Sequence, residues 1–199
     1  MINYSNLVHE GIHDAAVRQQ SGLVIGNRIP KDYFITKGTG ESDIAVHAGS
    51  YHLALKSAGI EMANIMTYSS ILPPIANEIP KPDSIYHGEV MESIMAVATG
   101  HESERLSAGI IFAWLYEEDK KYGGLVCENY GNFPLDELEW RLQESLKELY
   151  NAGYQHMELK DTRLIMDSFV PQKRFGSVIV SLCFTNYFYP VISGGKDLN

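Results

Sequence analysis

The chain has 199 residues, 45% of them hydrophobic, and its 25 acidic and 16 basic residues give a formal net charge of −9. This length and composition predict a single folded domain, residues 1–199, and argue against a disordered chain. The acidic balance argues against nucleic acid or an anionic membrane as a partner, because both select a concentrated positive surface.

Cysteine usage and the N-terminal residues predict where the protein works. Cys127 and Cys183 are isolated, without the paired spacing of a zinc site or a disulfide framework. The first residues lack the basic and apolar segments of a signal peptide, and no apolar run reaches membrane-spanning length. We therefore expect a soluble, cytoplasmic protein.

The first half of the chain has the pattern of short strands and turns around one helix. Residues 1–20 are polar and weakly patterned, which predicts an N-terminal arm outside the core. His9 and His13 lie in this arm four residues apart, but without an evident third ligand they do not predict a metal site. The elements expected after the arm are strands at 23–25 and 33–35, a loop at 37–43, a helix over 47–57 ended by Gly59, a strand from Asn64 into the two serines, and a rigid proline-rich linker at 73–82.

The second half contains the longest strand patterns and the clearest helix. Leucines recur at three- and four-residue steps and predict a helix over about 134–150, with Pro134 in its first turn and Gly153 at its end. Strands are expected at 90–98, 108–116, 124–128, 154–170 and 177–189, with turns at 100–105 and 117–121. This order is typical of an α+β sandwich rather than an alternating parallel sheet.

The stretch Ser69-Ser70-Ile71-Leu72-Pro73-Pro74 stands apart from this regular pattern. A strand of β-favouring residues runs into the two serines, and the prolines that follow cannot extend a hydrogen-bonded ladder. The peptide bond between the serines is therefore expected where pairing stops, so that it can bend without disrupting a sheet. From the residues alone, the plainer interpretation is a strand end followed by a proline turn.

With Asn64 upstream, the serine stretch resembles the self-cleavage site of the pyruvoyl-dependent arginine decarboxylases. Gly124-Leu-Val-Cys-Glu128 resembles the second motif of that family, and the resemblance covers about residues 22–190. It implies a four-layer α/β/β/α sandwich of the pyruvoyl-dependent histidine and arginine decarboxylase type. It also implies a homo-oligomer, a trimer of cleaved subunits or a hexamer, with active sites between neighbouring subunits.

The resemblance further implies how such a protein matures. The Ser70 hydroxyl would attack the Ser69 carbonyl carbon, and cleavage would separate residues 1–69 from residues 70–199. Ser70 would become a covalent pyruvoyl group, which accepts electrons when an amino acid loses CO2 and so takes the place of pyridoxal phosphate. Neither a metal nor pyridoxal phosphate is expected.

Site residues follow from the same resemblance. Asn64 would stabilise the oxyanion of the cleavage reaction, and Glu128 would be the acid/base residue of decarboxylation. Tyr51, His52 and Ile71 would contact the small-molecule amino-acid substrate. The plainer interpretation of Glu128 is a surface carboxylate at a strand end, which is the commoner place for a lone glutamate.

The substrate is the point where the chain departs from the family. Arginine, converted to agmatine and CO2, is the default, and arginine-specific members carry an aspartate twelve residues before the asparagine to bind the guanidinium group. Here His52 holds that position after Tyr51, and an imidazole cannot replace an aspartate–guanidinium pair. Either another acid such as Glu41 or Asp43 serves, or the protein decarboxylates a different amino acid. A non-cleaving, non-catalytic relative is the remaining alternative.

Overall fold

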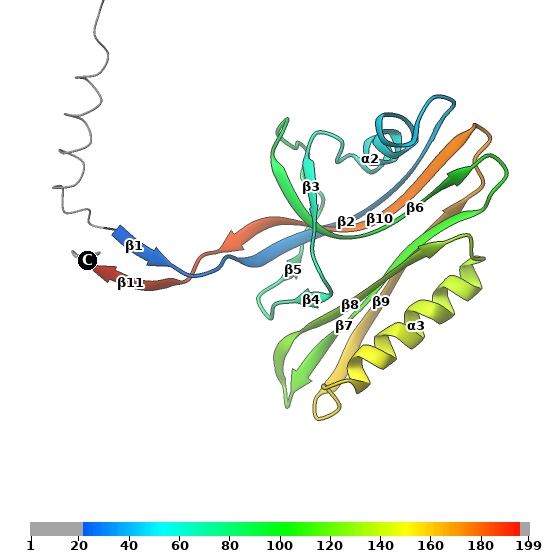
Figure 1. The fold of residues 1–199 in the computed structure, drawn as a ribbon. Coiled ribbons are helices and arrows are strands. Elements are labelled where there is room, and N and C mark those ends of the chain that lie inside the picture. The colour runs from blue at the N-terminus through cyan, green and yellow to red at the C-terminus, as the bar shows by residue number, and fades with distance from the viewer. Residues whose placement is uncertain (1–21, 196–199) are drawn as a thin grey trace, which may run out of the picture. The chain divides into compact units, whose positions relative to one another are not determined.

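The computed structural model describes residues 22–195, which fall into two compact units (Figure 1). Residues 30–187 form the larger unit, which holds the two large sheets and the helices. In the other unit β1 (Gly22–Ile25) pairs antiparallel with β11 (Val191–Gly195). The expected arm at 1–20, with its two histidines, lies outside the described residues, and the single domain stays a prediction.

Strands predominate among the described residues, as the sequence predicts. Between β1 and β11 the elements are, in chain order, β2 (Ile29–Ser42), a π-helical turn η1 (Val46–Tyr51), α2 (His52–Ala58), β3 (Asn64–Thr67), β4 (Ile71–Leu72), β5 (Asn77–Glu78), β6 (Val90–His101), β7 (Leu106–Glu117), β8 (Lys120–Gly131), α3 (Leu135–Asn151), β9 (Glu158–Phe169) and β10 (Phe175–Phe188). The predicted linker at 73–82 thus contains the short strand β5, which pairs parallel with β2.

Two sheets share one apolar core. The first has five strands in the order β3-β6-β10-β2-β5, and the second has four in the order β4-β8-β7-β9. Because successive side chains point to opposite faces of a strand, every second residue faces the partner sheet. The shared core includes Ile94, Val180 and Phe184 from the first sheet and Ile110 and Phe112 from the second.

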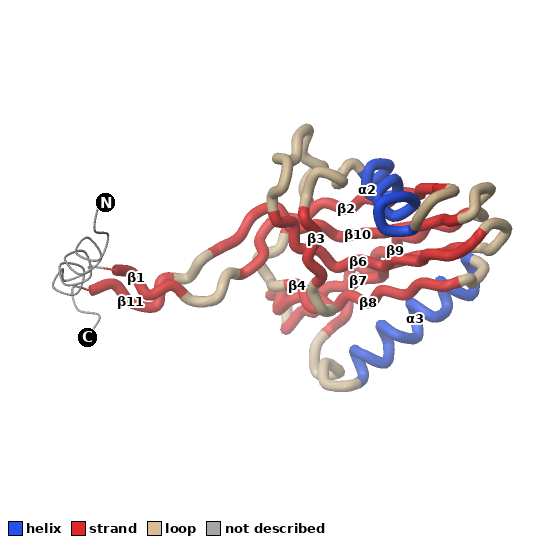
Figure 2. The backbone as a smooth tube through the Cα atoms, turned by 45° about the horizontal axis from the view of Figure 1, so that its top comes forward, coloured by secondary structure: helices blue, strands red, loops and turns tan. Residues whose placement is uncertain are grey.

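Helices cover the outer faces of both sheets (Figure 2). On the five-stranded sheet, Ala54 and Leu55 of α2 pack with Phe34 and Ile179 in a second buried cluster. On the four-stranded sheet, α3 closes a third cluster. The predicted α+β class, with strands in two sheets and two helices, is confirmed.

The prediction of a loop at 37–43 is wrong, because the strand β2 continues through Ser42. Its glycines serve a different purpose. A Cβ atom on Gly38 would lie 2.3 Å from the Ala54 carbonyl oxygen, and one on Gly40 would lie 2.3 Å from the Ser50 carbonyl oxygen. The glycines therefore let the helical segment lie directly on the strand, which local sequence patterns do not reveal.

The helix predicted over 47–57 is present but broken. The π-helical turn η1 leads into α2, with a non-helical residue at Gly49 (φ −125°, ψ −106°). Gly59 ends the helix as predicted, in the left-handed conformation (φ 70°), and its N–H bonds to carbonyls of the last turn.

The helix predicted over 134–150 is confirmed as α3, with small differences at its ends. Pro134 precedes the helix as its N-cap (ψ 155°) rather than standing in the first turn, and Ala152 rather than Gly153 is the C-cap. Three residues of the predicted apolar stripe are buried, Leu138, Leu142 and Leu146. Trp140 lies off the stripe and is 59% exposed.

Candidate active site

The Ser69–Ser70 bond lies where the chain crosses from one sheet to the other (Figure 1). It joins β3, the edge strand of the five-stranded sheet, to β4, the edge strand of the four-stranded sheet. Upstream, the Tyr68 N–H donates to the Ser93 carbonyl oxygen of β6 at 2.7 Å. Downstream, the Val126 N–H of β8 donates to the Ser70 carbonyl oxygen at 2.9 Å. The two serines are therefore held between anchors on different sheets.

The reason for the break in pairing differs from the one the prolines predict. Pairing resumes directly after the serines, where Ile71 and Leu72 stand opposite Leu125 and Gly124 of β8. The ladder stops at the serines because the chain changes sheets, and the prolines come later. The expectation that this bond can bend without breaking a sheet agrees with its position.

A short turn closes around Ser70. The Ile71 N–H donates to the Ser69 carbonyl oxygen at 3.1 Å, which is the pattern of a three-residue turn. Ser69 is exposed and Ser70 is half-buried. The carbonyl that a Ser70 hydroxyl would attack thus already accepts a hydrogen bond, and such a donor stabilises negative charge that develops on the oxygen.

Glu128 is half-buried, and it faces the space between the two sheets. Val126 belongs to the core between the sheets and Cys127 to the cluster under α3, so alternation places Glu128 on the face of Val126. Its Oε2 atom is buried without a hydrogen-bond partner among the described residues. Burial raises the pKa of Glu128 above its ordinary value. A half-buried carboxyl group with a raised pKa therefore lies two residues after Val126, which anchors Ser70.

Asn64 lies at the opposite end of β3 from the serine pair. Its side-chain amide donates to the Gly88 carbonyl oxygen at 3.0 Å. Five residues of extended chain separate it from Ser69, about 16 Å at the usual strand rise. A single chain therefore does not bring the amide to the scissile carbonyl, and the oxyanion role of Asn64 stays a prediction.

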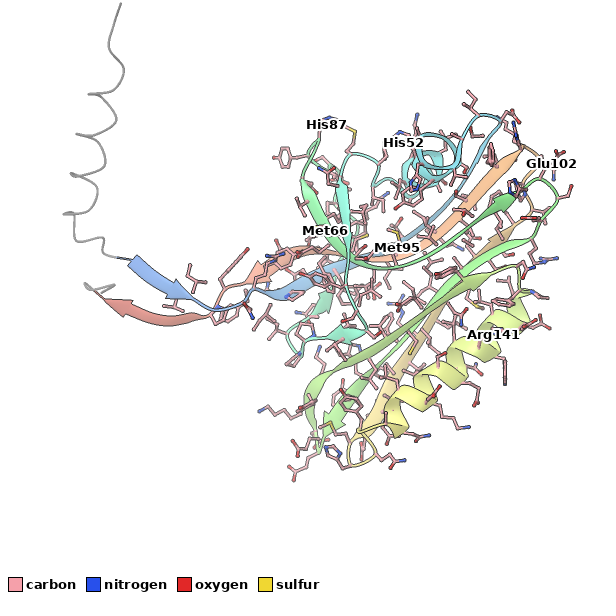
Figure 3. All side chains as sticks on the ribbon, viewed as in Figure 1. His52, Met66, His87, Met95, Glu102 and Arg141 are labelled. Atoms are coloured by element: carbon pink, nitrogen blue, oxygen red, sulfur yellow. The ribbon has the colours of Figure 1, made fainter. Side chains whose placement is uncertain are left out.

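Tyr51 and His52 lie on the outer side of the five-stranded sheet. The half-buried Tyr51 packs against the buried cluster between α2 and the five-stranded sheet. Its hydroxyl lies 3.9 Å from Met95 Sδ, and burial raises the pKa of Tyr51. His52 is exposed at the start of α2 (Figure 3). Because Glu128 faces the space between the two sheets, one chain does not bring these residues together, and their role as substrate contacts stays a prediction.

The two acids considered in place of the missing aspartate bind backbone groups instead. The Glu41 carboxylate accepts from the N–H groups of Gln172 and Lys173, at 2.6 and 3.0 Å. The Asp43 carboxylate accepts from the Arg174 N–H at 3.3 Å. Both acids therefore hold the turn between β9 and β10.

One pair of residues beside the serines is missed by sequence reasoning. Glu92 is 2% exposed, and its Oε2 accepts a hydrogen bond from the hydroxyl of Tyr68. The Tyr68 ring also lies against Phe184, with 5.5 Å between ring centroids. The two partners are 24 residues apart, so only the parallel pairing of β3 with β6 reveals the contact.

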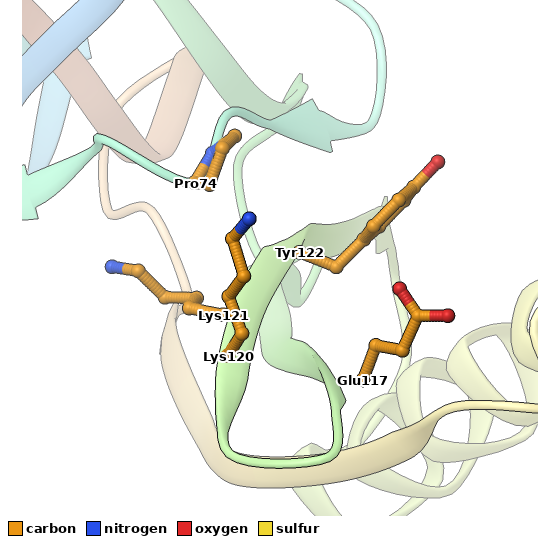
Figure 4. Close-up of a pocket in the computed structure, with 5 residues that line it drawn as sticks. All are labelled: Pro74, Glu117, Lys120, Lys121 and Tyr122. Atoms are coloured by element: carbon orange, nitrogen blue, oxygen red, sulfur yellow. The ribbon is translucent and has the colours of Figure 1, made fainter.

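Two cavities lie beyond the serines. Ile71 is 51% exposed and lines an apolar cavity of about 200 Å³ together with Tyr122 and Leu125. A second cavity of about 360 Å³ lies at the β7–β8 turn, and Figure 4 shows its lining residues Pro74, Glu117, Lys120, Lys121 and Tyr122. Neither cavity is lined by Ser70 or Glu128.

Comparison with known proteins decides the family. The family model described as pyruvoyl-dependent arginine decarboxylase matches residues 32–188. The chain belongs to this family. The match includes both β4 and β8, and so the serine pair and Glu128. The predicted membership is confirmed, and with it the expectation that the chain belongs to a family of carboxy-lyases.

Curated relatives carry the same family name. "Pyruvoyl-dependent arginine decarboxylase" of Methanocella arvoryzae is 30% identical over 123 residues, which cover 60% of this chain and 73% of the relative. The protein of that name from Methanococcoides burtonii is 36% identical over 101 residues, 48% of this chain and 53% of the relative. A "probable" pyruvoyl-dependent arginine decarboxylase of Chlorobaculum tepidum is 32% identical over 100 residues, 49% and 54% of the two chains. The match thus spans about half the length of the last two relatives.

Two further observations concern ligands and membranes. Across the described part of this decarboxylase-family chain, no three His, Cys, Asp or Glu side chains gather as metal ligands would. Within residues 22–195, no helix has both the length and the apolar composition required to span a bilayer. The expected absence of a metal stays a prediction.

Proposed function

We propose that the chain is a pyruvoyl-dependent amino-acid α-decarboxylase that matures by cleaving itself between Ser69 and Ser70. Its proposed reaction converts arginine to agmatine and CO2. The observation that carries the proposal is the position of the serine bond, which links two separately anchored sheets near the half-buried carboxyl group of Glu128. The family of the chain and the names of its relatives support the reaction class.

The self-cleavage needs only atoms of the serine stretch and water. The Ser70 hydroxyl oxygen bonds to the Ser69 carbonyl carbon, the C–N bond breaks, and the hydroxyl proton ends on the freed amine. Loss of the Cα proton of residue 70 then breaks the new ester, which leaves a carboxylate on Ser69 and dehydroalanine at position 70. Water replaces the nitrogen as ammonia, and the ketone remains. The Ile71 N–H stabilises the Ser69 oxyanion in the first step.

The residues present fit a pyruvoyl group at position 70. The Val126 N–H would hold the carbonyl of residue 70, since it already bonds that oxygen, and the unpartnered Oε2 of Glu128 lies on the same face of β8. When formed, the group supplies adjacent carbonyls that accept the electrons released by decarboxylation. Glu128, whose pKa burial raises, would deliver a proton to the substrate α-carbon after CO2 has left.

We extend the proposal to a homo-oligomer, a trimer or a hexamer. Asn64 lies far along β3 from Ser69, and His52 lies on the opposite side of the sheet from Glu128. A neighbouring copy can bring either side chain to the serine pair. We also assign the chain to the four-layer α/β/β/α type, which the helices on both outer faces support, and to the cytoplasm.

Intact-mass analysis of purified protein, combined with product analysis, tests the proposal. We expect two chains, 1–69 and 70–199, and arginine-dependent release of CO2 with formation of agmatine. The Ser70→Ala variant should stay full-length and inactive. A single full-length wild-type species without a keto group would contradict the proposal and favour a non-cleaving, non-catalytic relative.

A second candidate function is the decarboxylation of a different amino acid, and the position of His52 favours it. His52 is exposed on α2, and the nearby acids Glu41 and Asp43 already bind backbone N–H groups. An amino-acid panel assayed for CO2 release separates the candidates. Arginine as the best substrate supports the first, and another amino acid supports the second. Under the second, His52→Asp should raise the activity toward arginine.

A further inference from the structure

The hydrogen bond between Tyr68 and Glu92 is a buried feature that the proposed chemistry does not yet use. Glu92 precedes Ile94 by two residues on β6, so its side chain points toward the core between the sheets. There it is 2% exposed and accepts the bond from the Tyr68 hydroxyl. Tyr68 directly precedes Ser69.

Packing does not explain a carboxylate at this place. Removing a carboxylate from water costs free energy, and apolar residues of similar volume often stabilise such a site equally well or better. Its neighbours along the same face of the strand, Ile94 and Ala96, are apolar. The carboxylate therefore points to a role other than filling the core, and Tyr68, whose hydroxyl bonds to it, is the residue before the scissile bond.

The pair makes the upstream anchor of the serines rigid. Tyr68 is fixed at three points: its N–H bonds to Ser93, its hydroxyl bonds to Glu92, and its ring packs on Phe184. Without the side-chain bond, the anchor would depend on one backbone bond of an edge strand and on ring packing. Since Val126 fixes Ser70 from the other sheet, Ser69 alone spans the interval between the two anchors.

We propose that Glu92, acting through Tyr68, is a positioning residue for self-cleavage and sets the orientation of the Ser69 carbonyl toward the Ser70 hydroxyl. The inference rests on the proposed function. Self-cleavage is an intramolecular reaction whose rate depends on alignment, and a displacement of about 1 Å can slow such a step by about 100-fold. A hydrogen bond that restrains the residue before the reacting carbonyl controls that alignment.

The test measures the rate of chain separation in freshly synthesised full-length protein, followed on denaturing gels. Tyr68→Phe keeps the ring on Phe184 and removes only the hydroxyl, and we expect cleavage about 10-fold slower or more. Glu92→Leu should slow it similarly. Glu92→Gln should stay within about threefold of wild type, because the amide oxygen still accepts the bond. The double variant Tyr68→Phe/Glu92→Leu should be no slower than the slower single variant.

Tyr116→Phe is the matched control. It removes a tyrosine hydroxyl that bonds a carboxylate, Asp161, at 3.1 Å, in the other sheet. We expect it to cleave at the wild-type rate.

The outcomes separate the inference from the proposed function. If wild type never cleaves, the proposed function fails and the inference fails with it. If wild type cleaves and Tyr68→Phe matches its rate, the inference alone is overturned. Slowing by Glu92→Gln as large as that by Glu92→Leu would also overturn it, because the charge of Glu92 rather than its bond to Tyr68 would then matter. Effects of Tyr68→Phe and Glu92→Leu that multiply would overturn it as well, because the two residues would then act independently. Should Glu92→Leu fail to fold, Tyr68→Phe and Glu92→Gln still decide.

Discussion

Two carboxyl groups, the buried Glu92 and the half-buried Glu128, face the space between the sheets from either side of the serine crossing, and they differ in their partners. Glu92 accepts a bond from the Tyr68 hydroxyl, which suits a residue that holds its neighbour in place. Glu128 Oε2 has no partner among the described residues, which suits a group that exchanges a proton with a substrate. One carboxyl group is thus proposed to serve maturation and the other to serve turnover.

Replacing Glu128 by glutamine separates these roles. General acid–base groups contribute about 10²–10⁴-fold to rate, so we expect Glu128→Gln to lower kcat by at least about 100-fold. Self-cleavage should continue, because the glutamine keeps the size of the side chain and the anchors of the serines remain. Rates of CO2 release, measured on protein whose cleavage has been verified by mass, check this expectation. Full activity in the variant would refute the role of Glu128.

The raised pKa of Glu128 also predicts a pH dependence of stability. Burial disfavours the ionised form, so the folded protein binds this proton more tightly than the unfolded chain does. The stability that protonation contributes is therefore present below the ordinary glutamate pKa of about 4.3 and is lost as pH rises through the raised value. We expect Glu128→Gln to be more stable than wild type at neutral pH, with the difference shrinking toward acid pH. Urea unfolding at several pH values measures it, and a difference that is constant with pH would show that burial of the ionised carboxylate is not the cause.

At the scale of elements, predictability from sequence follows how local the determining contacts are. Helix α3 could be predicted because its leucine stripe lies within seventeen residues. The continuation of β2 through Gly38 and Gly40 could not be predicted, because these glycines make room for a helical segment that packs on them and is distant in the sequence. The break at Gly49 is hidden for the same reason, since a Cβ there would lie 2.5 Å from Ser42 Oγ on β2.

The close contact between β2 and the helical segment predicts the effect of a single methyl group. In Gly40→Ala the new Cβ would meet backbone atoms of Ser50 and Ala54 at 2.3 and 2.4 Å. Overpacking of this kind costs about 1–3 kcal/mol, so we expect a loss of that size in the free energy of unfolding. Gly153→Ala, whose Cβ would have no neighbour within 4 Å, is the control and should change stability little. Equal stabilities of the two variants in urea would contradict the close packing of β2 against the helical segment.

At the scale of the whole molecule, the proposed cleavage at the serine bond would divide the fold between two interleaved chains. Residues 1–69 supply β2, which lies between β10 and β5 in the five-stranded sheet, and also β3 at its edge. Phe34 of β2 is fully buried. Residues 70–199 supply the rest of both sheets. The order of strands would therefore hold the two parts together if the proposed cleavage removes the covalent link.

This interleaving predicts that the cleaved protein behaves as one particle. We expect the two chains to elute together from a sizing column under native conditions and to separate only in denaturant. The buried contacts of β2 are the reason, because its release would open the five-stranded sheet. Dissociation of the 1–69 chain in native buffer would contradict the central position of β2 in that sheet.

The site could be predicted only as far as its local motifs extend. The serine stretch and the Glu128 segment are short and contiguous, so the sequence predicts both. The crossing between sheets, the anchors from Ser93 and Val126, and the Tyr68–Glu92 pair depend on strand register across long separations. These contacts exist only once the sheets have formed, and for this reason no local sequence pattern predicts them.

Self-cleavage at the serine pair is tested best by the intact mass of freshly made, full-length protein followed over time. We expect the 199-residue species to give way to residues 1–69 and to residues 70–199, the latter lighter by one ammonia than the same chain with an N-terminal serine, once water has replaced that nitrogen. Persistence of the unbroken species in folded wild-type protein, or a break at any other bond, would contradict self-cleavage between Ser69 and Ser70.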